Sequence, residues 1–392
     1  MKRDVYLGLT FLIALLLLGG ALYQQPSATA AGAEAPMFEV DPLWPKPLPN
    51  HWRIGSTIGV SVDAQDHVWI IHRPATLDRK ELYAAQNPPA AVCCNAAPPV
   101  LEFDAAGNLV GSWGGAATSE KDGFEWPGSN HGITVDYKGN VWIGGNGLND
   151  AQVLKFTRAG KLLLQIGRSG QSKGSNDTAN LRRPAKLFID PQANELYVAD
   201  GYGNKRVIVY DADSGAYKRH WGAYGNKPDD TDLGPFNPAA PPAKQFRTPV
   251  HCADLANDGL LYVCDRTNNR IQVFRKDGTF VKEAFLERNS LGDGAVFDIA
   301  FSRDAGQKFL FVADGTNERV HILLRDSLEE LTNFGDGGRQ PGQFYAVHSI
   351  ATDSKGNLYT TETYEGKRLQ KFVYKGVGPV TKAVQGTVWP QR

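Results

Sequence analysis

One unit of sequence recurs six times along this chain, and the repeat constrains the fold more than any other feature. Each copy has an apolar strand that ends near an Asp, a Gly or Asn turn, a strand rich in Trp, Tyr and Val, and two further strands. The copies begin near residues 59, 131, 185, 251, 297 and 348. Four alternating strands cannot bury both faces alone, whereas copies arranged around an axis bury them and leave few exposed edges. The repeat therefore predicts an all-β fold, a six-bladed β-propeller with four strands in each blade.

The first residues indicate export. Lys2 and Arg3 precede an apolar run from Val5 to about Leu22, and the small residues Ala28, Thr29 and Ala30 follow. This order predicts a signal peptide over residues 1–30. An uncleaved membrane anchor is the alternative, because the apolar run is close to the shortest length that spans a bilayer. In both cases we expect the body of the protein to be secreted or periplasmic.

The remaining chain divides into a leader over residues 31–50 and a propeller over residues 51–392. Within the leader, Phe38 to Pro49 is expected to join the tail, Thr381 to Arg392, in a strand that fastens the ring. Lys and Arg together number 42, as do Asp and Glu, so no excess of one charge points to nucleic acid or to an anionic membrane.

Two segments interrupt the repeat, at residues 74–99 and 225–245. Both are rich in Pro, and loops of this length in a compact domain usually have a function or are mobile. The first segment follows directly on Arg73, so we expect it to form a lid over the axis. The alternative is a spacer that lies against the outside of blade 1.

The four cysteines are too few to build the fold through disulfides, and no C-x-x-C motif occurs. Cys252 and Cys264 flank the turn at Asn257–Gly259 almost symmetrically, and they are either a disulfide across two paired strands or two small buried residues. Cys93 and Cys94 are adjacent, within the first interrupting segment.

The repeat supplies a common register, and three histidines share it. His131 and His348 each stand five residues before the Asp that ends the inner strand, and His251 takes the same place when blade 4 is aligned on its turn. The corresponding residues of blades 1, 3 and 5 are Ile58, Ala185 and Phe297. Alternate blades of a sixfold ring are about 120° apart, so side chains at one register that point to the axis converge there.

Three imidazoles that meet with one side open are the ligand set of catalytic zinc, and we expect zinc or a similar divalent metal at His131, His251 and His348. The alternative is that each histidine is a polar residue satisfied at the start of its strand. The other histidines lack this register and are expected to be structural: His51, His67, His72, His220 and His321.

The turn from Asp265 to Ile271 resembles the NHL repeat, with further copies at Asp200–Val207 and Asp314–Val320. We expect the Arg of each turn to bond between neighbouring blades, at Arg206, Arg270 and Arg319.

The residues around the three histidines resemble the peptidyl-α-hydroxyglycine α-amidating lyases. The likeness rests on His72-Arg73, on the His-Gly of blade 2, on Asp200-Gly201-Tyr202 and on the two later histidines. In that family the three histidines bind zinc, and an Arg and a Tyr beside the metal act on a carbinolamide substrate and release glyoxylate. The resemblance therefore implies catalytic roles for Arg73 and Tyr202.

Both roles are chemically reasonable. Arg73 offers a planar fork that suits a carboxylate, and the hydroxyl of Tyr202 can exchange a proton. The alternatives are that Arg73 pairs with a structural Asp and that Tyr202 only fills its turn.

The chain departs from the family at two positions. Ala346 replaces a Met, and Ser349 replaces an Asp that helps to hold a structural calcium. The family's other calcium ligands are main-chain carbonyls, which match Val60 and Ile133. The resemblance thus implies a calcium at Val60 and Ile133, and the loss of the Asp argues against it.

The leading hypothesis is an exported metal-dependent lyase for a small-molecule or peptide substrate, either of the amidating type or a relative with another small substrate. The alternative is a non-catalytic NHL-repeat propeller that binds a protein or glycan partner. The enzyme requires a metal on the axis and a pocket beside it, whereas the binding protein requires neither. A lactonase-type propeller would surround calcium with Asn, Asp and Glu, and the histidines argue against it.

Overall fold

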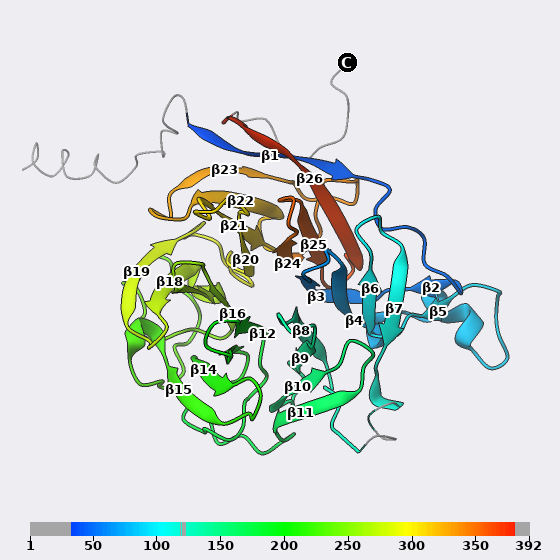
Figure 1. Cartoon of the computed structure of the whole chain (residues 1–392), viewed down its shortest axis with the longest axis horizontal. Helices are drawn as coiled ribbons and strands as arrows, with labels where there is room; N and C mark the ends of the chain where they lie inside the picture. The colour runs from blue at the N-terminus through cyan, green and yellow to red at the C-terminus, as the bar shows by residue number, and fades with distance from the viewer. Residues whose placement is uncertain (1–32, 118, 120–122, 381–392) are drawn as a thin grey trace, which may run out of the picture.

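The predicted six-bladed β-propeller is confirmed. The computed structural model describes residues 33–117, 119 and 123–380, in which six antiparallel four-stranded sheets surround a common axis (Figure 1). Blades 1 to 3 consist of β3 (Ser56–Val62), β4 (Val68–Arg73), β6 (Val100–Phe103) and β7 (Leu109–Trp113); β8 (Asn130–Val135), β9 (Val141–Gly145), β10 (Gln152–Phe156) and β11 (Leu162–Gly167); and β12 (Lys186–Asp190), β13 (Glu195–Asp200), β14 (Arg206–Asp211) and β15 (Tyr217–Trp221). Blades 4 to 6 consist of β16 (Val250–Leu255), β17 (Leu260–Asp265), β18 (Arg270–Arg275) and β19 (Phe280–Phe285); β20 (Asp298–Phe301), β21 (Phe309–Asp314), β22 (Arg319–Leu324) and β23 (Glu330–Phe334); and β24 (Val347–Thr352), β25 (Leu358–Glu362), β26 (Arg368–Pro379) and β1 (Glu34–Asp41).

The N-terminal strand closes the ring. β1 pairs antiparallel with β26, so blade 6 takes three strands from the end of the chain and its outer strand from the beginning (Figure 1). This strand begins at Glu34 and ends at Asp41, ahead of the expected Phe38–Pro49. The reason is local, because the prolines that begin at Pro42 cannot donate to a ladder. The tail, residues 381–392, lies outside the described residues.

The hydrophobic core lies between the blades. Six clusters of buried apolar side chains occur in the described residues, one at each interface between neighbouring blades. At the interface of blades 4 and 5, for example, Tyr262 packs edge-on against Phe301, with ring centroids 5.2 Å apart. Each blade is therefore stable only between its neighbours, which makes the ring one cooperative unit.

The recurring Asp at the end of the inner strand organises the turn behind it. In blade 2, Asp136 accepts main-chain N–H groups from Lys138 (2.9 Å) and Asn140 (2.8 Å), and the indole of Trp142 (2.9 Å). In blades 1 and 6 the aromatic residue of the second strand donates the corresponding hydrogen bond, from Trp69 to Asp63 and from Tyr359 to Asp353. This Asp thereby fixes the turn between the first two strands in several blades.

The buried Asp–Arg pairs of the NHL turns connect successive blades. Arg206 bonds to Asp200 at 2.8 Å and also donates to the main-chain carbonyls of Ser175 and Asn180, in the segment that enters from blade 2. Arg270 and Asp265 form the corresponding pair at 2.7 Å, and Arg270 reaches the carbonyls at residues 243 and 245. The segment 225–245, which continues from η3 (Ala223–Gly225), is thus held against blade 4 at its C-terminal end.

Blade 5 departs from this arrangement. Arg319 does not reach Asp314, and the buried imidazole of His321 takes its place, with Nε2 3.2 Å from Asp314 and Nδ1 2.7 Å from Glu330. Arg319 instead lies 3.8 Å from Glu287 near the surface. All three arginines thus contact the segment that enters from the preceding blade, as expected, but Arg319 does so through a partly exposed ion pair and not through a buried Asp–Arg pair.

The segment 74–99 lies beside the ring. It contains η1 (Pro74–Thr76), η2 (Lys80–Ala85) and β5 (Asn95–Ala96), which pairs in parallel with β2 (Trp52–Arg53). Glu81 is also paired with Lys367 of blade 6 at 2.6 Å. In Figure 1 the segment extends outward at the right, beyond β7 and away from the axis. These contacts hold it beside blade 1, so the expected lid over the axis is not formed.

The predicted signal peptide or anchor over residues 1–30 lies outside the described residues. Within the described part of the chain, no helix is both long and apolar enough to cross a bilayer.

The unfolding free energy should decrease as the pH rises from 6.5 to about 9.5. Burial opposes the charged form of His321, but its bonds to Asp314 and Glu330 prevail and raise its pKa to about 9. A raised pKa means that the stabilisation is complete below the unfolded-state pKa of about 6.5 and is lost as the pH passes 9. We expect a loss of about 3 kcal/mol, measured by denaturant unfolding at several pH values.

His321→Gln should remove most of this pH dependence, whereas His220→Gln should retain it, because burial lowers the pKa of His220 and keeps it neutral in this range. An equal pH slope in the wild type and His321→Gln would contradict the assignment.

Candidate metal centre

Three histidine side chains meet at the axis. His131 lies in β8, His251 in β16 and His348 in β24, the inner strands of alternate blades. Their ring centroids are 4.8 to 5.0 Å apart, and each residue is at most 4% exposed. One nitrogen of each ring lies within 4.8 Å of the other two. The structure thus brings together the three residues that share the register.

A β-bulge lies at each histidine. The strand pairing shifts register from Asn130 to Ile133, from Val250 to Cys252 and from Val347 to Ser349. The histidine is in each case left out of the regular ladder. Bulges commonly re-aim a side chain next to a functional site, and here they accompany three imidazoles that point to the axis.

The next blade orients each imidazole. Nδ1 of His131 bonds to the main-chain carbonyl of Ala185 at 2.8 Å, and Nδ1 of His348 bonds to that of Ile58 at 2.7 Å. Nδ1 of His251 bonds to the carbonyl of Phe297 in the same way. These acceptors are the residues that hold the histidine register in blades 3, 1 and 5. A carbonyl oxygen only accepts, so each Nδ1 carries the hydrogen and each Nε2 keeps a free electron pair.

Burial keeps the three rings neutral. Burial, with the nearby charges of Arg266 and Arg73, lowers the pKa of His348 to about 3. Burial also lowers the pKa values of His131 and His251 well below the usual value. Neutral imidazoles bind a metal without first losing a proton, so this donor set fits a divalent ion of the zinc type with a position left for substrate.

Tyr202 places its hydroxyl against the histidines. The oxygen is 3.0 Å from Nε2 of His131 and 3.0 Å from Nε2 of His251. Tyr202 stands two residues after the end of β13, and Arg266 donates to the same oxygen at 3.1 Å. The phenol has one hydrogen and cannot satisfy both Nε2 atoms at once, so this group of atoms is suited to a further ligand.

Arg73 lies at the same end of the axis. Its Nε donates to the carbonyl of Asn130 at 2.9 Å, and its terminal nitrogen donates to the side chain of Asn146 at 2.7 Å. Its hydrogen bonds thus go to neutral acceptors of blade 2 and not to a structural Asp. A guanidinium without a carboxylate partner remains available to an anionic substrate.

Arg266 is the functional candidate that the sequence analysis missed. It is 6% exposed, its guanidinium lies 4.6 Å from the ring centroid of Phe297, and its Nε has no hydrogen-bond partner among the described residues. The register could have found it, because Arg73 stands fifteen residues after Ile58 and Arg266 fifteen residues after His251. The two arginines therefore occupy equivalent positions in blades 1 and 4, which face each other across the axis (Figure 1).

The calcium expectation does not fit the residues present. Ser349, in the place of the family's Asp, donates its hydroxyl hydrogen to Asp298 at 2.6 Å. The ammonium group of Lys186 pairs with Asp298 at 2.6 Å and with Asp254 at 2.9 Å. The main-chain positions Val60 and Ile133 lie in the inner strands β3 and β8, but the nearby carboxylates already have a cation.

Four of the other histidines have structural side-chain contacts in the described residues, namely His67, His72, His220 and His321, and His51 is exposed. His72, for example, is buried, accepts a hydrogen bond from the N–H of Gly55 and bonds to the carbonyl of Pro98, and burial lowers its pKa to about 4. His67 lies beside Asp63 and Glu102, but Arg158 pairs with both carboxylates there. That group is an ion-pair cluster.

Comparison with known proteins finds similarity to NHL-repeat and amidating proteins. The NHL repeat family matches residues 250–274. The chain is 27% identical over 85% of its length to peptidyl-alpha-hydroxyglycine alpha-amidating lyase 1 of Drosophila melanogaster, where the match covers 59% of that protein. It is 33% identical over 60% of its length to peptidyl-glycine alpha-amidating monooxygenase B of Xenopus laevis, where it covers 25%. It is also 26% identical over 87% of its length to mouse NHL repeat-containing protein 3, where it covers 85%.

The chain is a six-bladed propeller that carries an NHL repeat and is similar to the amidating lyases. This relationship agrees with the resemblance in the residues around the histidines. The match spans 59% of the amidating lyase and 25% of the amidating monooxygenase, which is less than two thirds of either protein. Their activity and substrates are therefore considered for this amidating-lyase-like chain only under the proposed function.

The purified amidating-lyase-like protein should contain close to one zinc or similar divalent ion per chain. Replacing His131, His251 or His348 with Ala should each reduce the metal content at least tenfold, because two histidines are too few to retain the ion. Elemental analysis after dialysis measures this content. His51→Ala, at an exposed histidine far from the shared register, is the control and should keep its metal. Unchanged metal content in all three site variants would contradict the assignment.

Proposed function

We propose that this protein is an exported, metal-dependent lyase that cleaves a carbinolamide of the peptidyl-α-hydroxyglycine type into an amide and glyoxylate. The observation that carries the proposal is the convergence at one end of the axis of three neutral imidazoles, a tyrosine hydroxyl and two guanidinium groups. The same geometry would suit another small α-hydroxy acid derivative. Among these possible substrates, the similarity to the amidating lyases favours the peptidyl-α-hydroxyglycine.

Strand register supports a common position for the three catalytic candidates. Arg73 ends β4, Arg266 directly follows β17, and Tyr202 stands two residues after the end of β13; these are the second strands of their blades. These strands run antiparallel to the inner strands, so their last residues lie where the inner strands begin. The histidines also lie near the beginning of their inner strands.

The site residues have distinct parts in the proposed reaction. A zinc-type ion held by His131, His251 and His348 would supply the Lewis acidity that makes a bound hydroxyl acidic at neutral pH. Arg73 and Arg266 bind the substrate carboxylate and fix the hydroxylated carbon between them.

Tyr202 carries the proton. In the reaction the C–N bond of the carbinolamide breaks, the hydroxyl oxygen becomes the aldehyde oxygen of glyoxylate, and the hydroxyl proton ends on the amide nitrogen. The hydroxyl of Tyr202 lies against Nε2 of both His131 and His251, where it can accept this proton and return it to nitrogen.

The disulfides support the proposed export to the periplasm or the cell exterior. Cys252 and Cys264 are paired across β16 and β17, and Cys93 and Cys94 are paired with each other. Disulfides persist mainly in oxidising compartments. They agree with the signal peptide expected over residues 1–30.

A non-catalytic propeller that binds a protein or glycan is the second candidate. It is favoured by the similarity to NHL repeat-containing protein 3, which extends over most of both chains. That candidate requires neither the metal nor the buried Arg266, and fully metallated protein without turnover would support it.

Metal-loaded protein should release glyoxylate from an α-hydroxyglycine-capped peptide. Arg73→Ala and Arg266→Ala should each reduce kcat/KM about 100-fold or more, because each removes a charged hydrogen-bond donor for the carboxylate. Tyr202→Phe should reduce kcat by about 100-fold through loss of proton transfer. A coupled assay for glyoxylate measures these rates.

All three variants should retain their metal, since none of the three residues is a ligand. Arg79→Ala, which removes an exposed arginine from the segment beside blade 1, is the matched control and should keep full activity. Full activity in Arg73→Ala and Arg266→Ala together would contradict their proposed role.

A further inference from the structure

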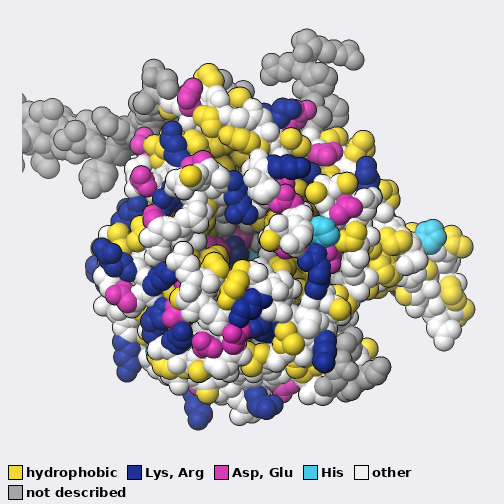
Figure 2. Space-filling model, in the orientation of Figure 1, with side chains coloured by type: hydrophobic (Ala, Val, Ile, Leu, Met, Phe, Trp, Pro, Cys, Tyr) yellow, Lys and Arg dark blue, Asp and Glu magenta, His cyan; other side chains and the backbone are white. Residues whose placement is uncertain are grey.

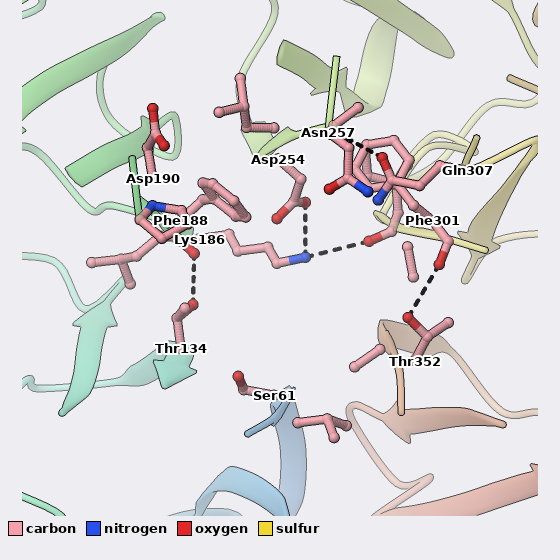
Figure 3. Close-up of a pocket in the computed structure, with 18 of the residues that line it drawn as sticks. Ser61, Thr134, Lys186, Phe188, Asp190, Asp254, Asn257, Phe301, Gln307 and Thr352 are labelled. Carbon is pink, nitrogen blue, oxygen red and sulfur yellow. Dashed lines mark hydrogen bonds and ion pairs between the residues drawn. The ribbon is translucent and has the colours of Figure 1, made fainter. Parts of the chain in front are cut away.

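A lysine lies across the interior of the ring. The ammonium group of Lys186, from β12 of blade 3, bonds to Asp254 of blade 4 at 2.9 Å and to Asp298 of blade 5 at 2.6 Å. Figure 3 shows Lys186 extended toward Asp254 across the pocket. The side chain of Lys186 is 14% exposed, and those of Asp254 and Asp298 are 11% and 3% exposed. One cation therefore joins three consecutive blades in the interior.

The ion-pair group of Lys186, Asp254 and Asp298 lies next to the histidines in the common register. Lys186 directly follows Ala185, whose carbonyl accepts from His131, and Asp298 directly follows Phe297, whose carbonyl accepts from His251. Ser349, directly after His348, donates to Asp298. The ion-pair group thus occupies the layer of residues next to the three histidines.

Lys186 separates two spaces on the axis. A small space of about 10 Å³ is lined by the histidines together with Ile133, Asp298 and Ser349. A cavity of about 320 Å³ lies further along the inner strands and is lined by residues from all six blades, among them Val60 and Asp254. Lys186 lines both spaces, and it is the residue they share. Figure 2 shows one face of the ring hollowed at its centre.

Charge balance explains why a cation is required here. Two buried carboxylates that face each other repel, and both lose hydration, so they need a counter-charge. Burial raises the pKa of Asp254 to about 6 despite Lys186. Asp298 is also fully engaged, because it accepts from Ser349 and from the N–H of Ile350 (3.0 Å) in addition to Lys186.

We propose that Lys186 is the built-in cation of the axis, in place of the structural calcium that the resemblance implies. The protein then folds and holds its three-histidine site without calcium. Replacing Lys186 with a neutral side chain should convert Asp254, Asp298 and their oxygen neighbours into a divalent-cation site. This inference does not depend on the proposed lyase activity.

The test compares calcium binding by zinc-loaded wild type and Lys186→Met, using isothermal titration calorimetry and the unfolding midpoint with and without millimolar calcium chloride. The wild type should give no binding heat and no shift of the midpoint. Lys186→Met should unfold about 5–10 °C lower without calcium, because it leaves two buried carboxylates unpaired. Calcium should bind this variant at one site and restore most of the lost stability.

Lys276→Met is the matched control. Lys276 pairs with Asp190 at 2.6 Å and lines the same cavity, but its replacement leaves one carboxylate without its cation and not two. This variant should not bind calcium. Lys186→Met combined with Asp298→Asn should also lose the calcium response.

Two results would overturn the proposal. The first is calcium binding by the wild type that is lost in Asp298→Asn, and the second is a folded Lys186→Met variant that binds no calcium. If Lys186→Met does not fold without calcium, both Lys186→Met and Lys186→Gln are refolded in the presence of calcium. Recovery of either variant only with calcium supports the proposal, and failure of both under both conditions contradicts it. These outcomes are measured by calcium binding and by stability, so none of them depends on glyoxylate release.

Discussion

Three hydrogen bonds connect the propeller to its axial site, each from a histidine Nδ1 to a main-chain carbonyl of the next blade. Their acceptors are main-chain atoms, so their geometry depends on the relative height of neighbouring inner strands and not on a particular side chain. A displacement of one blade along the axis would break the bond and turn an imidazole away. The aspartates that fix the turns and the closure of the ring by β1 are therefore conditions for the site as well as for the fold.

The axis has an ordered distribution of charge along its length. Arg73 and Arg266 bring positive charge to the end where the inner strands begin, and the neutral histidines follow. The next layer holds Lys186 with two carboxylates, so it has one more negative than positive group when both carboxylates are ionised. An anionic substrate is thus attracted to one end of the axis, where the imidazoles, the tyrosine hydroxyl and the arginines are arranged.

The repeat was sufficient to predict the blades and the meeting of His131, His251 and His348, because equal register in a closed ring implies equal height. Arg266 was missed because it lies within the turn Asp265–Ile271, where its neighbours have an evident structural role. The place of the segment 74–99 could not be predicted, since it depends on the pairing of β5 with β2 and of Glu81 with Lys367. Lys186 was missed for a similar reason: its partners come from two other blades, and no local pattern marks them.

The proposed chemistry depends on one divalent ion held by the three Nε2 atoms. Its most direct test is a crystal of the zinc-loaded protein measured on both sides of the zinc absorption edge. We predict a single anomalous peak on the axis, about 2.0–2.1 Å from Nε2 of His131, His251 and His348. An axis without an anomalous peak, in protein that contains stoichiometric zinc elsewhere, would contradict it.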